Sequence, residues 1–308
     1  MFFESALKGK NSFWRYLLMF FIVFFVTNTI GALPLIVTVI IKGVSNPEIL
    51  DASPENLMNL STYGIDSNTG LILMLFPFII GLLTLYLLVK PLHHRKFIDL
   101  FNGGGKIRWN KFFMSALVWL ILMGIYLYIC ISNDPGNFTI NNISSSLLWL
   151  IIIAVLLIPF QTTFEELLFR GYLMQGAGAW FKNKWIPLLL TSLLFGLMHS
   201  FNPEIKEFGF WVMIPQYVTF GLVFGLLAIL DNGIELAMGA HAANNVFLSI
   251  LVTQKSSALQ TAALYEQQRV YPWSEFFSLI IISVLFIVLM WILNRWCLKD
   301  IFKMECDN

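Results

Sequence analysis

Residues 147–175 read LLWLIIIAVLLIPFQTTFEELLFRGYLMQ. The first half of this stretch, residues 147–160, carries no charged side chain. A helix of about 20 mostly apolar residues is long enough to cross the hydrocarbon core of a bilayer. We therefore expect a membrane-spanning helix here, with its charged residues Glu165, Glu166 and Arg170 near one end.

The composition of the whole chain supports a membrane protein. Of the 308 residues, 58% are apolar and 12% are charged, whereas soluble domains have about 25% charged residues. So few charged residues cannot cover a soluble surface, but they suit a surface that faces lipid. The net charge of +1 gives no indication of a nucleic-acid partner.

Apolar stretches that could span the membrane recur along the chain. The eight expected spans are roughly 14–41, 70–89, 112–131, 147–175, 185–200, 210–230, 233–253 and 275–296. Gly or Pro interrupts several of them, which membrane helices tolerate when neighbours satisfy the freed backbone groups. The sequence thus predicts an all-α polytopic transmembrane bundle of about eight spans, forming one integral membrane domain, 1–308.

The distribution of Lys and Arg predicts the orientation. With eight spans and a cytoplasmic N-terminus, 15 of the 19 basic residues fall on the cytoplasmic side and 4 on the external side. Cytoplasmic loops of membrane proteins carry the excess of Lys and Arg. We therefore expect both termini in the cytoplasm.

Ionisable groups inside a membrane span are costly and by default mark functional sites. Glu166 and Arg170 are four residues apart with the acid first, the favourable order for a helical ion pair. Adjacent residues on a helix point about 100° apart, so we expect Glu165 and Glu166 to have different partners. Glu165 is then free to act as a general base. The alternative, an ion pair beside an interfacial acid with no catalytic role, stays open.

Two of the four histidines also lie in apolar spans. His199 ends the stretch FGLMH, and His241 begins HAANN, in which His241 and Asn245 share one helix face at the i, i+4 spacing. A single membrane histidine more often bonds to a neighbouring helix than catalyses a reaction, and this alternative also stays open. For Asp231 and Glu235, at the start of the seventh span, a structural role at the helix N-terminus is expected.

The three patterns E-E-x-x-x-R, F-x-x-x-H and H-x-x-x-N follow one another on separate apolar stretches. Together they resemble the CAAX protease and bacteriocin-processing family, which includes the type II CAAX prenyl endopeptidases and the Abi proteins. The matching residues are Glu165, Glu166, Arg170, Phe195, His199, His241 and Asn245. The resemblance covers about 150–254, the expected catalytic core. The run from Phe164 through Leu173, followed by Met174 and Gln175, is similar to bacterial members.

The resemblance implies an intramembrane endopeptidase that hydrolyses a peptide bond near the membrane surface, and we expect the cleavage near the cytoplasmic membrane face. Two mechanisms use the same residues. In the glutamate-type mechanism, Glu165 and His199 activate a water, and His241 and Asn245 donate hydrogen bonds to the oxyanion. In the metallo-type mechanism, Glu165, His199 and His241 bind zinc. We favour the metal-free mechanism, because the amide of Asn245 is a poor zinc ligand and a good oxyanion donor.

The expected location is a bacterial cell membrane. The expected partners are membrane lipids and a peptide or lipidated-protein substrate, and no nucleic acid. We expect the catalytic side chains to meet in one cavity that opens towards the cytoplasm. The competing functions are a transporter or ion-binding protein, which also uses polar groups at the membrane midplane, and a non-catalytic immunity or scaffold protein of the same family.

Overall fold

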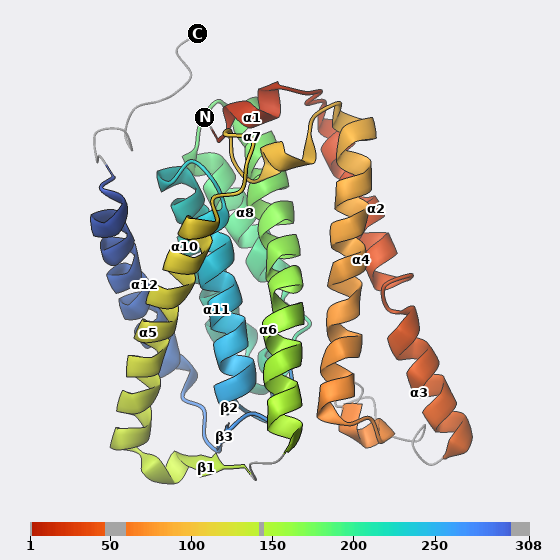
Figure 1. The fold of residues 1–308 in the computed structure, drawn as a ribbon, viewed down its shortest axis with the longest axis vertical. Helices are drawn as coiled ribbons and strands as arrows, with labels where there is room; N and C mark the ends of the chain where they lie inside the picture. The colour runs from red at the N-terminus through yellow and green to blue at the C-terminus, as the bar shows by residue number, and fades with distance from the viewer. Residues whose placement is uncertain (1, 47–59, 142–144, 297–308) are drawn as a thin grey trace.

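The computed structural model describes residues 2–46, 60–141 and 145–296, which form a bundle of helices (Figure 1). The N-terminal helices are α1 (Glu4–Leu7), α2 (Phe13–Asn28), α3 (Leu33–Ser45), η3 (Leu60–Tyr63), α4 (Ser67–His93), η4 (Phe97–Leu100) and α5 (Trp109–Asn133). They are followed by η5 (Pro135–Asn137), α6 (Ser145–Glu166), the π-helix η6 (Leu167–Met174), α7 (Gln175–Phe181) and α8 (Trp185–Met198). The last helices are α9 (Pro203–Phe208), α10 (Phe210–Leu230), α11 (Glu235–Leu251) and α12 (Pro272–Asn294).

The predicted fold class is confirmed. Among the described residues, six helical stretches are long and apolar enough to cross a membrane. They are Phe13–Ser45, Ser67–His93, Trp109–Asn133, Ser145–Phe181, Phe210–Leu230 and Pro272–Asn294. The other two expected spans correspond to the shorter apolar helix α8 and to the more polar α11.

Helix α11 lies at the centre of the bundle, where it packs against α5, α6 and α10 (Figure 1). Most of its side chains are buried, including Glu235, His241 and Asn244. Small residues allow this close packing. A Cβ atom at Gly239, for example, would collide with the backbone of Phe112 and lie 2.9 Å from Oγ of Ser115. Because neighbouring helices enclose α11, it carries polar side chains without exposing them to lipid.

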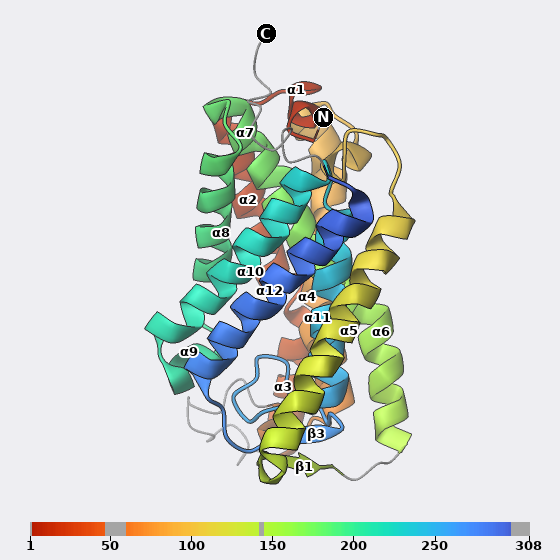
Figure 2. The same cartoon turned by 90° about the vertical axis from the view of Figure 1, so that its left-hand side faces the viewer.

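A small sheet marks one end of the bundle. Its strands are β1 (Phe138–Ile140), β2 (Val252–Thr253) and β3 (Tyr265–Gln267), with β3 in the middle, antiparallel to β1 and parallel to β2. Helices α1 and α7 lie at the opposite end (Figures 1 and 2). We call these two ends the sheet end and the α1 end.

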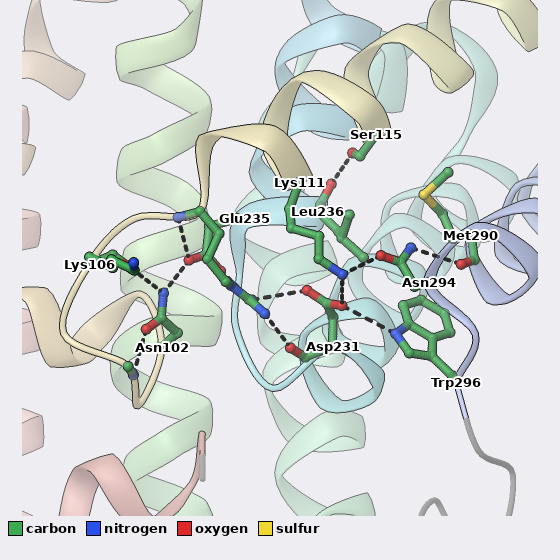
Figure 3. A network of polar contacts seen from close by, with 12 residues as sticks. Asn102, Lys106, Lys111, Ser115, Asp231, Glu235, Leu236, Met290, Asn294 and Trp296 are labelled. Atoms are coloured by element: carbon green, nitrogen blue, oxygen red, sulfur yellow. Dashed lines mark hydrogen bonds and ion pairs between the residues drawn. The ribbon is translucent and has the colours of Figure 1, made fainter.

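At the α1 end, a polar network ties α5, α11 and α12 together (Figure 3). Arg108 pairs with Asp231 at 3.0 Å and with Glu235 at 2.6 Å. Asp231 also pairs with Lys111 at 3.0 Å and accepts a hydrogen bond from the indole of Trp296. Both acids thus have structural roles, but Asp231 follows the last residue of α10 and does not lie at the N-terminus of α11, so ion pairs and not the helix dipole explain its position.

Candidate functional site

A cavity of about 290 Å³ lies between α6, α8, α10 and α11. All four residues that the sequence suggests as catalytic line it, namely Glu165, His199, His241 and Asn245. They come from three helices, α6, α8 and α11, that are separated by long stretches of sequence. The fold therefore brings these polar side chains, from separate apolar segments, to one place.

The expected ion pair between Glu166 and Arg170 is present and buried. Nη1 of Arg170 lies 2.7 Å from Oε1 of Glu166, and the two side chains are 1% and 0% exposed. Nη2 donates a hydrogen bond of 3.2 Å to the carbonyl oxygen of Gly221 on α10. The guanidinium also lies over the ring of Phe195, 4.6 Å from its centroid. Arg170 belongs to the π-helical segment η6, a conformation often found at functional sites.

His241 lies between the two acids. Its Nδ1 is 2.8 Å from Oε1 of Glu166, and its Nε2 is 3.6 Å from Oε2 of Glu165. The ring stacks on Phe224 at a centroid distance of 4.9 Å. The expectation that adjacent acids have different partners is therefore wrong, because an imidazole with a nitrogen on each edge can meet both. Glu166 thus positions His241 as well as neutralising Arg170.

A chain of amides supports the other side of Glu165. Nε2 of Gln161 donates a hydrogen bond of 3.1 Å to Oε1 of Glu165, and Nδ2 of Asn245 donates one of 3.4 Å to Oε1 of Gln161. Asn244 donates to Oδ1 of Asn245 and accepts from the indole of Trp119. Gln161 lies outside the three sequence motifs, although its i, i+4 spacing to Glu165 is a signal that could have identified it.

His199 caps the last turn of α8. Its Nδ1 is 2.7 Å from the carbonyl oxygen of Phe195, and because a carbonyl only accepts, Nδ1 carries the hydrogen. In the neutral ring, Nε2 is then a proton acceptor. The ring stacks on Tyr217 at 4.2 Å, and the hydroxyl of Tyr217 accepts a hydrogen bond from Asn202. The F-x-x-x-H spacing thus fixes the tautomer of His199 through the backbone of Phe195.

The cavity extends in the direction opposite to the one expected. From Glu165 and His241 it follows α11 past Asn245 and Ser249 to Thr253 in β2, at the sheet end. The sequence led us to expect an opening on the side of the termini. The difference arises because α8 begins at Trp185 without a delayed start, so that His199 lies at the end of α8 far from the α1 end.

The residues of the proposed zinc set are not arranged as ligands in this structure. Among the residues that the structure describes, no three His, Cys, Asp or Glu side chains are grouped so that they could hold a metal ion. His241 lies with one nitrogen near each acid, whereas the hydrogen bond from Nδ1 of His199 to a backbone carbonyl leaves its Nε2 available to a metal as well as to a proton.

Comparison with known proteins agrees with the motifs. Residues 144–247 match the model of the Rce1-like type II CAAX prenyl endopeptidase family. The family resemblance drawn from the motifs is thus confirmed over this segment. The match supports an intramembrane CAAX-type protease at the level of the family, and the six apolar helices support an integral membrane protein.

A relative extends the similarity beyond that segment. The chain is 28% identical over 292 residues to the uncharacterized protein YyaK of Bacillus subtilis (strain 168). The aligned region covers 94% of this chain and 95% of YyaK, so the two proteins are similar along nearly their whole lengths. No solved structure matches the chain.

Proposed function

We propose that this protein is an intramembrane endopeptidase of the glutamate type, which hydrolyses a peptide bond inside the cavity between α6, α8 and α11. The main support for this proposal is that one cavity is lined by Glu165, His199, His241 and Asn245. In membrane proteins, polar groups of this kind are retained where they line a water-accessible cavity. A peptide or lipidated-protein segment is the proposed substrate.

In the proposed reaction, Glu165 and His199 together activate the attacking water. Nε2 of His199 is the proton acceptor of the neutral ring, and the carboxylate of Glu165 lines the same cavity. The water oxygen bonds to the carbonyl carbon of the peptide, and its proton passes to one of these two groups. A general base in such a position contributes roughly 10²–10⁴-fold to the rate. The same proton then reaches the leaving amine as the C–N bond breaks.

The oxyanion of the tetrahedral intermediate is assigned to Asn245 and His241. The side-chain amide of Asn245 has one hydrogen bonded to Gln161 and a second hydrogen to donate. His241 offers Nε2–H when the ring is protonated, and the carboxylates of Glu165 and Glu166 beside it balance that charge. Loss of one oxyanion donor typically lowers kcat by about 10²–10³-fold.

The test of this function is cleavage by metal-free protein. Purified protein in lipid nanodiscs is incubated with a library of lipid-tethered peptides, and the products are identified by mass spectrometry. Because the proposed steps involve only side chains, we expect cleavage to continue after exhaustive chelation, with no stoichiometric zinc in the active protein. The His199→Ala variant is the inactive control.

Two results would contradict different parts of the proposal. Cleavage that is lost on chelation and restored by zinc would replace the glutamate-type mechanism with the metallo-type one. Wild-type protein that cleaves no peptide more than the His199→Ala control would remove the protease assignment. Substrate flux in proteoliposomes would then indicate a transporter.

We further propose a bacterial cell membrane as the location, with the α1 end in the cytoplasm. This orientation rests on the excess of Lys and Arg expected on the cytoplasmic side. The cavity then extends towards the external surface, because it runs to the sheet end. Substrate access is accordingly proposed from the external side and not from the cytoplasmic face.

Cysteine labelling in intact cells tests the orientation. Single cysteines replace Lys106, near the α1 end, or Gly136 in η5, where an added side chain meets no neighbour. The native Cys130, Cys297 and Cys306 are first replaced by Ala. We expect a membrane-impermeant maleimide to label position 136 and to reach position 106 only after the cells are opened. The reverse pattern would invert the orientation and move the cavity to the cytoplasmic side.

A further inference from the structure

The outer part of the cavity carries acids that the proposed reaction does not use. Glu204 on α9 and Glu275 on α12 line it together with Glu165. None of the residues that line the cavity is Lys or Arg. Apart from the reacting histidines His199 and His241, the charged groups of the cavity are acids, and an excess of acids concentrates positive charge. It therefore disfavours an anionic substrate segment and favours a cationic one.

Of the two acids that the proposed reaction does not use, Glu204 is the one with a buried, unpaired carboxylate oxygen. It is 7% exposed, and one carboxylate oxygen, Oε1, accepts a hydrogen bond of 2.7 Å from the backbone N–H of Ala258. The other oxygen, Oε2, is buried and accepts no hydrogen bond from the described residues. Burial raises the pKa of this carboxyl above its ordinary value. Leaving a buried acceptor unpaired costs free energy, so a ligand that donates to Oε2 would be bound favourably.

Glu204 follows His199 closely in the chain and is connected to it through neighbouring side chains. Helix α9 begins four residues after His199, and Asn202 between them bonds to Tyr217, which stacks on His199. Glu275 differs from Glu204, because it is only partly buried and neither of its carboxylate oxygens is among the buried polar atoms without a hydrogen bond. Glu204 is therefore the better partner for a charged donor close to the scissile bond.

We propose that Glu204 binds the cationic side chain of a Lys or Arg residue near the scissile bond of the peptide substrate. This specificity rests on the proposed function. A charged donor forms a stronger hydrogen bond with a carboxylate than a neutral donor does.

A side chain fits better than a free chain terminus. The cavity continues past Glu204 to Thr253 and Gln254, which also line a second cavity of about 610 Å³ at the sheet end. Peptide chain can therefore continue beyond Glu204. The cationic group is accordingly assigned to a residue within the substrate, and not to its free α-amino group.

Binding measured without turnover tests this inference separately from catalysis. Fluorescently labelled peptides with blocked termini carry a single Lys, moved one residue at a time through a neutral sequence, or norleucine in its place. Their affinities are measured by anisotropy on protein that carries His199→Ala. At the best position we expect the Lys peptide to bind at least about tenfold tighter than the norleucine peptide, equivalent to about 1.4 kcal/mol.

Two further substitutions in the same background identify the group responsible. Glu204→Gln should reduce the ratio of the two affinities to about one. Glu207→Gln makes the same change of charge on the exposed side of α9, outside the cavity, and should leave the ratio intact. In protein with His199 intact, Glu204→Gln should raise KM for the Lys peptide and leave kcat nearly unchanged.

Several outcomes would overturn the inference. Equal affinity for the Lys and norleucine peptides at every position would do so, and so would a preference that survives Glu204→Gln. A norleucine peptide with a free N-terminus that binds as tightly as the Lys peptide would reassign the cation to the α-amino group. A Lys preference that depends on Glu204 in a protein that cleaves nothing would support the binding site and refute the proposed function.

Discussion

Replacement of Glu165 by Gln is expected to lower kcat/KM for peptide cleavage by at least about 10²–10⁴-fold, the range for loss of a general base. The folded protein should persist, because the glutamine oxygen can still accept the hydrogen bond that Gln161 now donates to Oε1. Cleavage rates, yield after size-exclusion chromatography and the midpoint of thermal unfolding are the measurements.

Glu207→Gln is the matched control for this prediction. Glu207 is exposed on α9 and does not line the cavity, so the same loss of one carboxylate there should change neither activity nor yield. Wild-type activity in Glu165→Gln protein would refute the role of Glu165. Loss of folded protein in that variant would instead show that the carboxylate is structural.

Replacement of Arg170 by Met is expected to destabilise the protein by about 3–5 kcal/mol, the cost of leaving one member of a buried ion pair without its partner. The charge of Glu166 would remain at a position with 0% exposure, with only His241 nearby to compensate it. We expect a sharp fall in the yield of folded protein in detergent and a lower midpoint of thermal unfolding.

The double variant Glu166→Gln with Arg170→Met separates charge from packing. It removes both charges, and the amide oxygen of the introduced glutamine can still accept the hydrogen bond from Nδ1 of His241. Because replacing a whole buried pair is often neutral, we expect most of the folded yield to return. A double variant as unstable as Arg170→Met would mean that packing of Arg170 on Phe195 and Phe224 matters more than its charge.

The helices were predictable from the sequence because each depends on local composition. Apolar length alone identified 210–230, which coincides with α10, and 185–200, which nearly matches α8. The first expected span contains Gly31, and the structure breaks there into α2 and α3. A Cβ at Gly31 would lie 2.8 Å from Cα of Pro77 on α4, so the break accommodates the close approach of another helix.

The arrangement of the site was predictable only where spacing along one helix determines it. The pair of Glu166 and Arg170 follows from the i, i+4 rule and is present. The two contacts of His241 with Glu165 and Glu166 depend on how α11 sits against α6. No local pattern encodes that relation. The direction of the cavity likewise depends on tertiary packing, because it is set by where along α11 the C-terminal end of α8 lies.

The π-helical segment η6 has a consequence for the long helix that contains it. Successive residues of an α-helix turn by about 100°, and a π-helical turn contains more residues because each hydrogen bond spans one residue further. Helices α6 and α7 therefore differ in rotational phase although they are continuous. Before η6 the helix presents Glu165 to α11, and after it Gly176 and Gly178 face Tyr16 and Phe3. Deleting one residue from Leu167–Met174 would misalign one of these faces by about 100°, so the length of this segment sets the angle between the reactive side of the helix and its anchored side.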